Sequence, residues 1–148
     1  MDIDLSQTEA DALIAMHKYR VNEDKHKYPY AGHSLRIPLV SGDKHEKFML
    51  TIRRGRIDLI NSTFQNLERH NVVLIRVDIG GPTHRNPDAA EVQCPHIHIY
   101  KEGFGDKWAF PLPPDRFTNP DNQWQTLREF MQFCNVVNPP NIIGRLII

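Results

Sequence analysis

Residues 72–79 read Val72-Val73-Leu74-Ile75-Arg76-Val77-Asp78-Ile79, and their alternation is the clearest strand pattern in the chain. Side chains along a strand point to opposite faces in turn. The β-branched row that ends at Val77 and Ile79 is the better candidate for the core. The sequence therefore predicts that Arg76 and Asp78 lie on the face away from the core, and that Gly80-Gly81-Pro82 ends the strand.

A second strand is predicted at residues 96–101, which read His96-Ile97-His98-Ile99-Tyr100-Lys101. Alternation places both histidines and Tyr100 on one face and turns the two isoleucines into the core. If this strand pairs antiparallel with residues 72–79 through the 80–95 loop, Arg76 and Asp78 lie beside the two histidines. We expect Lys107 to join them from the next strand.

The remaining pattern predicts helices at both ends and strands between them. Ser6-Gln7-Thr8-Glu9 is a capping box that begins a helix ending near Arg20, and Asn119-Pro120 begins a second helix that reaches Cys134. We predict a surface loop at 22–34, strands at 35–40, 48–52 and 107–110, a return strand through Ile57 and Leu59, and a final strand or docked tail at 142–148.

These elements predict a single α+β domain over residues 1–148. We expect a mostly antiparallel sheet of about five to seven strands, with the N-terminal and C-terminal helices packed on one face and the other face partly open.

Composition is that of an ordinary globular protein, with 148 residues, 40% hydrophobic residues and 18 basic against 18 acidic side chains. This balance excludes a disordered chain and binding to nucleic acid by bulk charge. Local binding remains open, because a basic segment that could guide RNA comprises Lys44, Lys47, Arg53, Arg54 and Arg56.

The expected location is the cytoplasm, without a membrane partner. No apolar run approaches the roughly 18 residues that span a bilayer, and the acidic start, Met1 to Leu5, does not resemble a signal peptide. Cys94 and Cys134 are too few for a disulfide framework, so we expect two buried or half-buried free thiols.

The leading functional hypothesis is a histidine-dependent phosphodiesterase or ribonuclease, possibly toxin-like, that needs no cofactor and acts on RNA or a nucleotide. Imidazole titrates near neutral pH and can serve as both general base and general acid. His96 and His98 would be catalytic, assisted by His84, Arg76 and Lys107, with cations stabilising the charge that develops on phosphorus. Substrate-binding candidates are Asp78, Arg85, Asp88 and Tyr100.

Two other functions remain open. Histidines two apart on a strand suit two ligands of one ion, so His84, His96 and His98 are candidate ligands of a divalent metal in a hydrolase or nuclease. A non-enzymatic module would instead bind a protein or small ligand through Phe104, Trp108, Tyr100 and Phe110. A plain structural interpretation also exists, with His-x-His as a polar row, Arg76–Asp78 as an ion pair and residues 83–88 as a turn.

The chain as a whole resembles an uncharacterised bacterial domain family of unknown function. The resemblance rests on Arg76-Val77-Asp78, His84-Arg85-Asn86-Pro87-Asp88, Pro95-His96-Ile97-His98-Ile99-Tyr100, Gly105-Asp106-Lys107-Trp108-Ala109 and Asn119-Pro120-Asp121. It covers most of the chain and implies a bacterial or mobile-element origin. It implies no activity, and no site residue comes from it.

Overall fold

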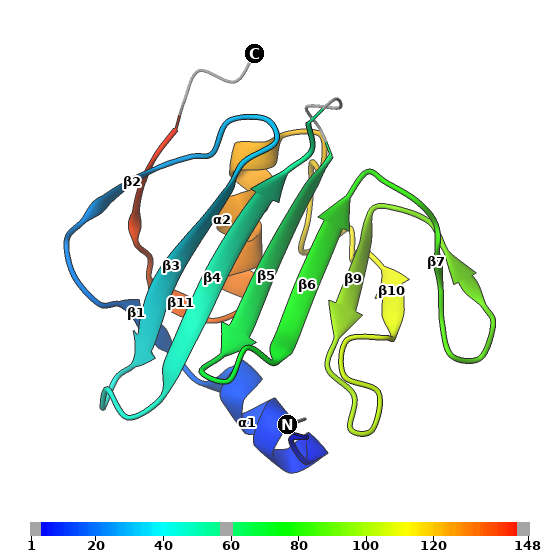
Figure 1. Ribbon diagram of the computed structural model, residues 1–148, viewed down its shortest axis with the longest axis horizontal. Helices are drawn as coiled ribbons and strands as arrows, with labels where there is room; N and C mark the ends of the chain where they lie inside the picture. Colours follow the sequence, from blue (N-terminus) through cyan, green and yellow to red (C-terminus); the bar gives the residue numbers. More distant parts are fainter. Residues whose placement is uncertain (1–3, 57–60, 145–148) are drawn as a thin grey trace.

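A computed structural model describes residues 4–56 and 61–144 and contains one large sheet with two helices (Figure 1). The centre of the sheet is an antiparallel meander, in which each strand pairs with the next along the chain. Its strands are β3 (Ser34–Ser41), β4 (Lys47–Arg54), β5 (Ser62–Glu68) and β6 (Val73–Ile79). The strand predicted at 72–79 is thus confirmed, and it ends where Gly80 and Gly81 adopt positive φ.

Four shorter strands extend the sheet to eight, in the order β10-β9-β6-β5-β4-β3-β1-β11. They are β9 (His96–Ile99), β10 (Ala109–Pro111), β1 (Lys18–Arg20) and β11 (Val136–Asn138). Within this sheet only β1 and β11 run parallel. The sheet is therefore larger than the predicted five to seven strands, because the three-residue strands β1 and β11 are too short to show an alternating pattern.

Helix α2 (Gln123–Phe133) covers one face of the sheet (Figure 1). Phe130 packs against Phe64 of β5, with ring centroids 5.9 Å apart. The helix begins later than predicted, because Asn122 is the N-cap and its side chain accepts a hydrogen bond from the Gln125 amide. Pro120 thus precedes the helix.

Helix α1 (Gln7–Ala15) begins at the predicted capping box, in which Ser6 and Glu9 exchange hydrogen bonds. It ends well before Arg20, since residues 18–20 form β1. The helix lies at one end of the sheet (Figure 1). The expectation that both helices pack on one face is therefore wrong for α1.

Two small two-stranded sheets complete the fold: β2 (Lys25–Lys27) with β12 (Asn141–Ile143), and β7 (His84–Arg85) with β8 (Glu91–Val92). The surface loop predicted at 22–34 is wrong in part, because it contains β2 and the fully buried Tyr28. The predicted return strand at Ile57 and Leu59 and the tail at 146–148 lie outside the described residues. Among those residues, no helix combines the length and apolar character needed to cross a bilayer.

Candidate metal centre

Strand register brings the predicted site residues together. In the antiparallel β6–β9 pair, Arg76 lies opposite His98 and Asp78 lies opposite His96. These residues alternate with Val77 and Ile97, which are buried in the core. The site is therefore on the sheet face opposite α2, as the alternation predicted.

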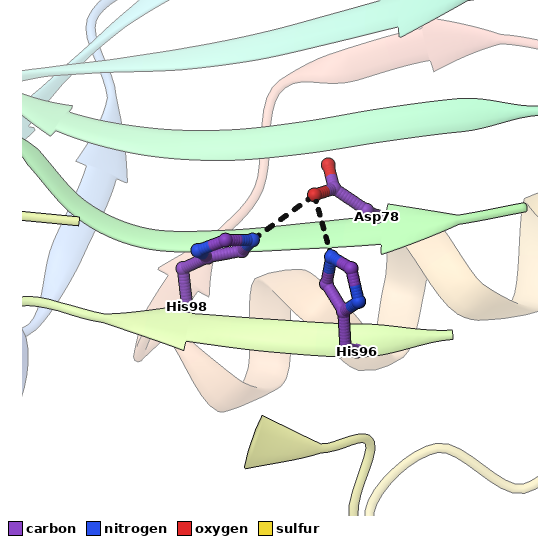
Figure 2. Close-up of side chains that lie close together, drawn as sticks. All are labelled: Asp78, His96 and His98. Atoms are coloured by element: carbon purple, nitrogen blue, oxygen red, sulfur yellow. Dashed lines mark hydrogen bonds and ion pairs between the residues drawn. The ribbon is translucent and has the colours of Figure 1, made fainter. Parts of the chain in front are cut away.

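Both imidazoles point at one carboxylate oxygen (Figure 2). Nε2 of His96 lies 3.0 Å from Oδ2 of Asp78, and Nε2 of His98 lies 3.1 Å from the same atom. Candidate ligand atoms of the three residues all lie within 4.8 Å of one another. Over residues 4–56 and 61–144, this is the one group of His, Cys, Asp and Glu side chains with that property.

The other nitrogen of each ring faces a backbone carbonyl. Nδ1 of His98 lies 2.7 Å from the carbonyl oxygen of Asp106, and Nδ1 of His96 lies 3.3 Å from that of Val92. A carbonyl only accepts hydrogen bonds, so each Nδ1 is the donor and carries the proton. With Nδ1 protonated, Nε2 of a neutral ring has a lone pair that can bind a cation shared with Asp78, and Nε2 of a protonated ring donates a hydrogen bond to Asp78.

Asp78 is held in place from two further sides. Arg76 donates to both carboxylate oxygens at 3.0–3.2 Å, and the Thr63 hydroxyl donates to Oδ1 at 3.0 Å. Burial raises the pKa of Asp78, but hydrogen bonds from His98 and Arg76, the charge of Arg76 and a hydrogen bond from His96 outweigh it. The net result is a pKa well below the usual range, and the group is a carboxylate.

The two imidazoles are almost completely buried, at 2% exposure for His96 and 1% for His98. The expectation that they lie on an open face is wrong. His84 packs edge-on against both rings, with centroids 5.9 Å from His96 and 4.6 Å from His98. Together with the backbone at Val92 and Asp106, this ring covers the site.

His84 is oriented by its own carbonyl contact, in which Nε2 donates to the Lys107 oxygen at 2.7 Å. The three side chains whose ligand atoms lie close together are thus Asp78, His96 and His98, whereas the sequence hypothesis for a metal site named His84 in place of Asp78. Lys107 has an exposed side chain and meets this region through its carbonyl oxygen.

Three predicted substrate-binding residues have structural partners elsewhere. Tyr100 is 3% exposed, and its hydroxyl donates to the Leu5 carbonyl and accepts from the Leu5 amide, so it is not available to a substrate. Arg85 forms an exposed ion pair with Glu91 across the β7–β8 hairpin. Asp88 accepts from the Ala90 amide, which supports the interpretation of that segment as a turn.

The sequence analysis missed residues that fix the site. Asn86 is buried, and its amide both donates to the carbonyl and accepts from the N–H of Ala109, which ties the hairpin to β10. Asp106 forms an ion pair with Arg76 at 3.1 Å and supplies the carbonyl for His98. Their roles depend on contacts distant in sequence, so local spacing gave no signal for them.

A cleft of about 320 Å³ opens beside the cluster. Cys94 in its wall is a half-buried free thiol, and Cys134 is a buried one, as expected. Burial, followed by the charge of Asp78, raises the pKa of Cys94 above its ordinary value. The lining of the cleft includes Arg53, Arg76, Asp78, His84, Cys94 and His96.

The predicted basic segment and the predicted aromatic anchors are only partly available for binding. Arg53 is exposed in the cleft, whereas Arg54 is buried and donates to the Pro29 carbonyl. Phe104 folds back against Trp108, with ring centroids 5.9 Å apart, and Lys101 lies over the Trp108 ring. These contacts occupy the aromatic hairpin tip that the binding-module hypothesis required.

Comparison with curated proteins finds no match, and comparison with solved structures finds none either. A family model does match, over residues 5–136, and its description is a family of unknown function, DUF6978. This span includes the whole β6–β9 site and the whole of both helices. The chain therefore belongs to the DUF6978 family, in agreement with the resemblance found in its sequence.

Proposed function

We propose that this protein is a metal-dependent hydrolase of phosphodiesters, with a divalent transition-metal ion bound by Asp78, His96 and His98. The observation that supports it best is the orientation of the two imidazoles: both Nδ1 atoms donate to carbonyls, and both Nε2 atoms converge on one carboxylate oxygen. One cation at that point satisfies all three groups at once.

The distances are close to those around a shared ion. Tetrahedral ligand atoms at about 2.0–2.1 Å from one Zn²⁺ lie about 3.3–3.4 Å apart. The two Nε2–Oδ2 distances are 3.0 and 3.1 Å, so the ligand atoms need to move apart by only about 0.3 Å. Two imidazoles and one carboxylate form a common ligand set of catalytic zinc and non-haem iron sites, which leave positions open for water or substrate.

The surrounding contacts are those of a metal centre. Ligating histidines usually donate their second nitrogen to a carbonyl or carboxylate, which fixes the ring and its tautomer. His96 and His98 do so here, while Thr63 and Arg76 hold the carboxylate. The ligands are therefore fixed before any ion arrives.

The cleft provides for an anionic substrate. The ion would lower the pKa of a coordinated water to about 7 and so supply a nucleophile at neutral pH. Arg53 and Arg76 line the same cleft and would bind the phosphate and stabilise its developing charge. In hydrolysis the water oxygen bonds to phosphorus, one ester P–O bond breaks, and the leaving oxygen takes up the proton that the water releases.

Metal-free acid–base catalysis by His96 and His98 has less support. Their nitrogens are bound to Asp78 and to backbone carbonyls, and both rings are almost fully buried. A general acid or base must reach the proton that it transfers. Neither ring has a nitrogen left over for a substrate.

The test is hydrolysis of bis(p-nitrophenyl) phosphate by protein stripped with EDTA and then given Zn²⁺ or Mn²⁺. We expect activity to return with one equivalent of metal, and to fall at least 100-fold in His98→Ala and Asp78→Asn. His45→Ala, an exposed histidine in the β3–β4 turn, is the matched control and should keep full activity. Full activity of the stripped protein would contradict the proposal, as would inactivity with every metal tried.

A further inference from the structure

The uncovered face of the sheet has a polar surface that continues from the metal centre. Register pairs align two rows of side chains across β3, β4, β5, β6 and β9 on the face opposite α2. One row is Ser34, Arg53, Thr63, Asp78 and His96, and the other is Arg36, Thr51, Gln65, Arg76 and His98.

The surface is hollowed along its length. The cleft beside Asp78 and a second cavity of about 150 Å³ share Arg53 and Thr63 in their walls. The second cavity reaches Arg36 on β3. The two cavities therefore adjoin at Arg53 and Thr63, and together we call them the groove; its other end has the proposed metal ligands Asp78 and His96 in its wall.

The charge of the groove is positive. The two rows contain three arginines and one carboxylate, Asp78, which already accepts hydrogen bonds from Arg76. Arg36 and Arg53 are exposed. Arg36 uses one of its nitrogens to donate to Asn71, and a guanidinium has five N–H donors in all.

We propose that this groove binds a single-stranded nucleic acid and leads its backbone to the metal centre; the inference rests on the proposed phosphodiester hydrolysis. From β3 to β9 the groove crosses four strand spacings, or about 19 Å. Arg36 is therefore out of reach of a single nucleotide bound at the ion, and only a polymer engages both ends.

The groove's size favours a single strand over a duplex. A cleft of about 320 Å³ has the size of a small-molecule site, so a double helix would have to lie across its mouth without entering it. The two rows contain no aromatic ring besides the imidazoles, so bases have little to stack on. Binding should therefore depend on phosphate contacts and be sensitive to salt.

The experiment is fluorescence anisotropy with a labelled 12-nucleotide strand, as RNA and as DNA of the same sequence, and with the corresponding duplex. EDTA is present throughout, so binding is measured without turnover and independently of the hydrolysis test. We expect single strands to bind at least tenfold more tightly than duplex. Tighter binding of RNA or of DNA identifies which of the two the groove prefers.

Arg36→Ala and Arg53→Ala should each weaken single-strand binding at least threefold and reduce the slope of log K against log salt by about 0.7. Arg128→Ala is the matched control, since this exposed arginine lies on α2, across the sheet from the groove. Wild-type binding by the Arg36 and Arg53 variants would overturn the inference, as would preference for the duplex or no binding of either single strand. The Arg36→Ala result is independent of hydrolysis of the small ester, whereas Arg53→Ala should also slow that hydrolysis, because Arg53 lines the cleft beside the proposed metal ligands.

Discussion

Two buried polar clusters among the described residues, one around Lys18 and one around Asp78, differ in the partners of their hydrogen-bonding groups. Lys18 of β1 is fully buried, and its ammonium donates to the carbonyls of Ile14, Met16 and Cys134 at 2.8–3.1 Å. An ammonium has three donors and no acceptor, so this cluster is complete. At Asp78, His96 and His98, in contrast, a carboxylate oxygen meets two nitrogens whose partner nitrogens already carry the protons.

The difference separates a cluster that serves the structure from one proposed to bind an ion. Lys18 joins the segment after α1 to the end of α2, and all three of its donors have partners within the chain. In the Asp78 cluster two imidazole nitrogens converge on one carboxylate oxygen, and a cleft opens beside them.

Removing the complete cluster should have the largest effect on stability. Lys18→Met keeps much of the side-chain volume but leaves three carbonyls without a donor, and should lower the free energy of unfolding by about 3 kcal/mol. Urea denaturation measures this. Metal affinity should not change, and Lys25→Met, at an exposed position, should stay within about 0.5 kcal/mol of wild type. A shift in metal affinity in Lys18→Met would break the distinction between the clusters.

Binding of a metal ion to Asp78, His96 and His98 should stabilise the fold. A ligand that binds only the native state at 100 times its Kd adds about 2.7 kcal/mol to the free energy of unfolding. We expect this gain with Zn²⁺ for wild type and for Lys18→Met, and not for His98→Ala. Thermal unfolding monitored by circular dichroism, with and without zinc, gives the comparison. An equal gain in His98→Ala would place the ion elsewhere.

A smaller effect is expected from the groups that orient the ligands. Thr63→Val removes the hydrogen bond to Oδ1 of Asp78 with little change of shape, and should weaken metal binding about tenfold. The control is Thr118→Val, which loses a similar hydrogen bond to Glu129 far from the site. Calorimetric titration with zinc distinguishes them; equal affinities in the two variants would show that Thr63 does not orient Asp78.

The smallest expected effect is a pH dependence of the free energy of unfolding that is due to Lys18. Burial lowers the pKa of Lys18 from 10.5 to about 8, and the nearby Cys134 opposes this shift. Between these two pKa values Lys18 is protonated in the unfolded chain and largely deprotonated in the folded chain, so the free energy of unfolding rises with pH. From pH 8 to 9 the free energy of unfolding should increase by about 1 kcal/mol relative to Lys18→Met. If the free energy of unfolding of wild type fell relative to that of Lys18→Met over this range, the lowered pKa of Lys18 would be contradicted.

The pairing of the central strands was predictable, because alternation in residues 72–79 and 96–99 settles which side chains share a face. The burial of Tyr100 was not predictable, because it depends on hydrogen bonds to Leu5, which is distant in sequence. Burial of the histidines was not predictable either. The two rings are covered by His84 and by the backbone carbonyls of Val92 and Asp106, and these groups come close to the rings only when the chain folds.

The missed elements share a physical reason. Strand β5 is polar on the uncovered face at Thr63 and Gln65, and it buries Asn66 on the other, so it lacks the hydrophobic alternation of β6. Strand β1 is three residues long and contains Lys18, a residue expected on a surface. Asp78 was predicted beside the two histidines, but as a substrate-binding residue, because the metal hypothesis was built on three histidines.

The most direct test is crystallography of the protein with Zn²⁺, using an anomalous difference map at the zinc edge. We predict one strong peak per chain, about 2.0–2.1 Å from Oδ2 of Asp78 and from Nε2 of His96 and His98. A map with no peak between these three atoms at saturating zinc, or with the imidazoles still bound directly to the carboxylate, would contradict the assignment of a metal centre.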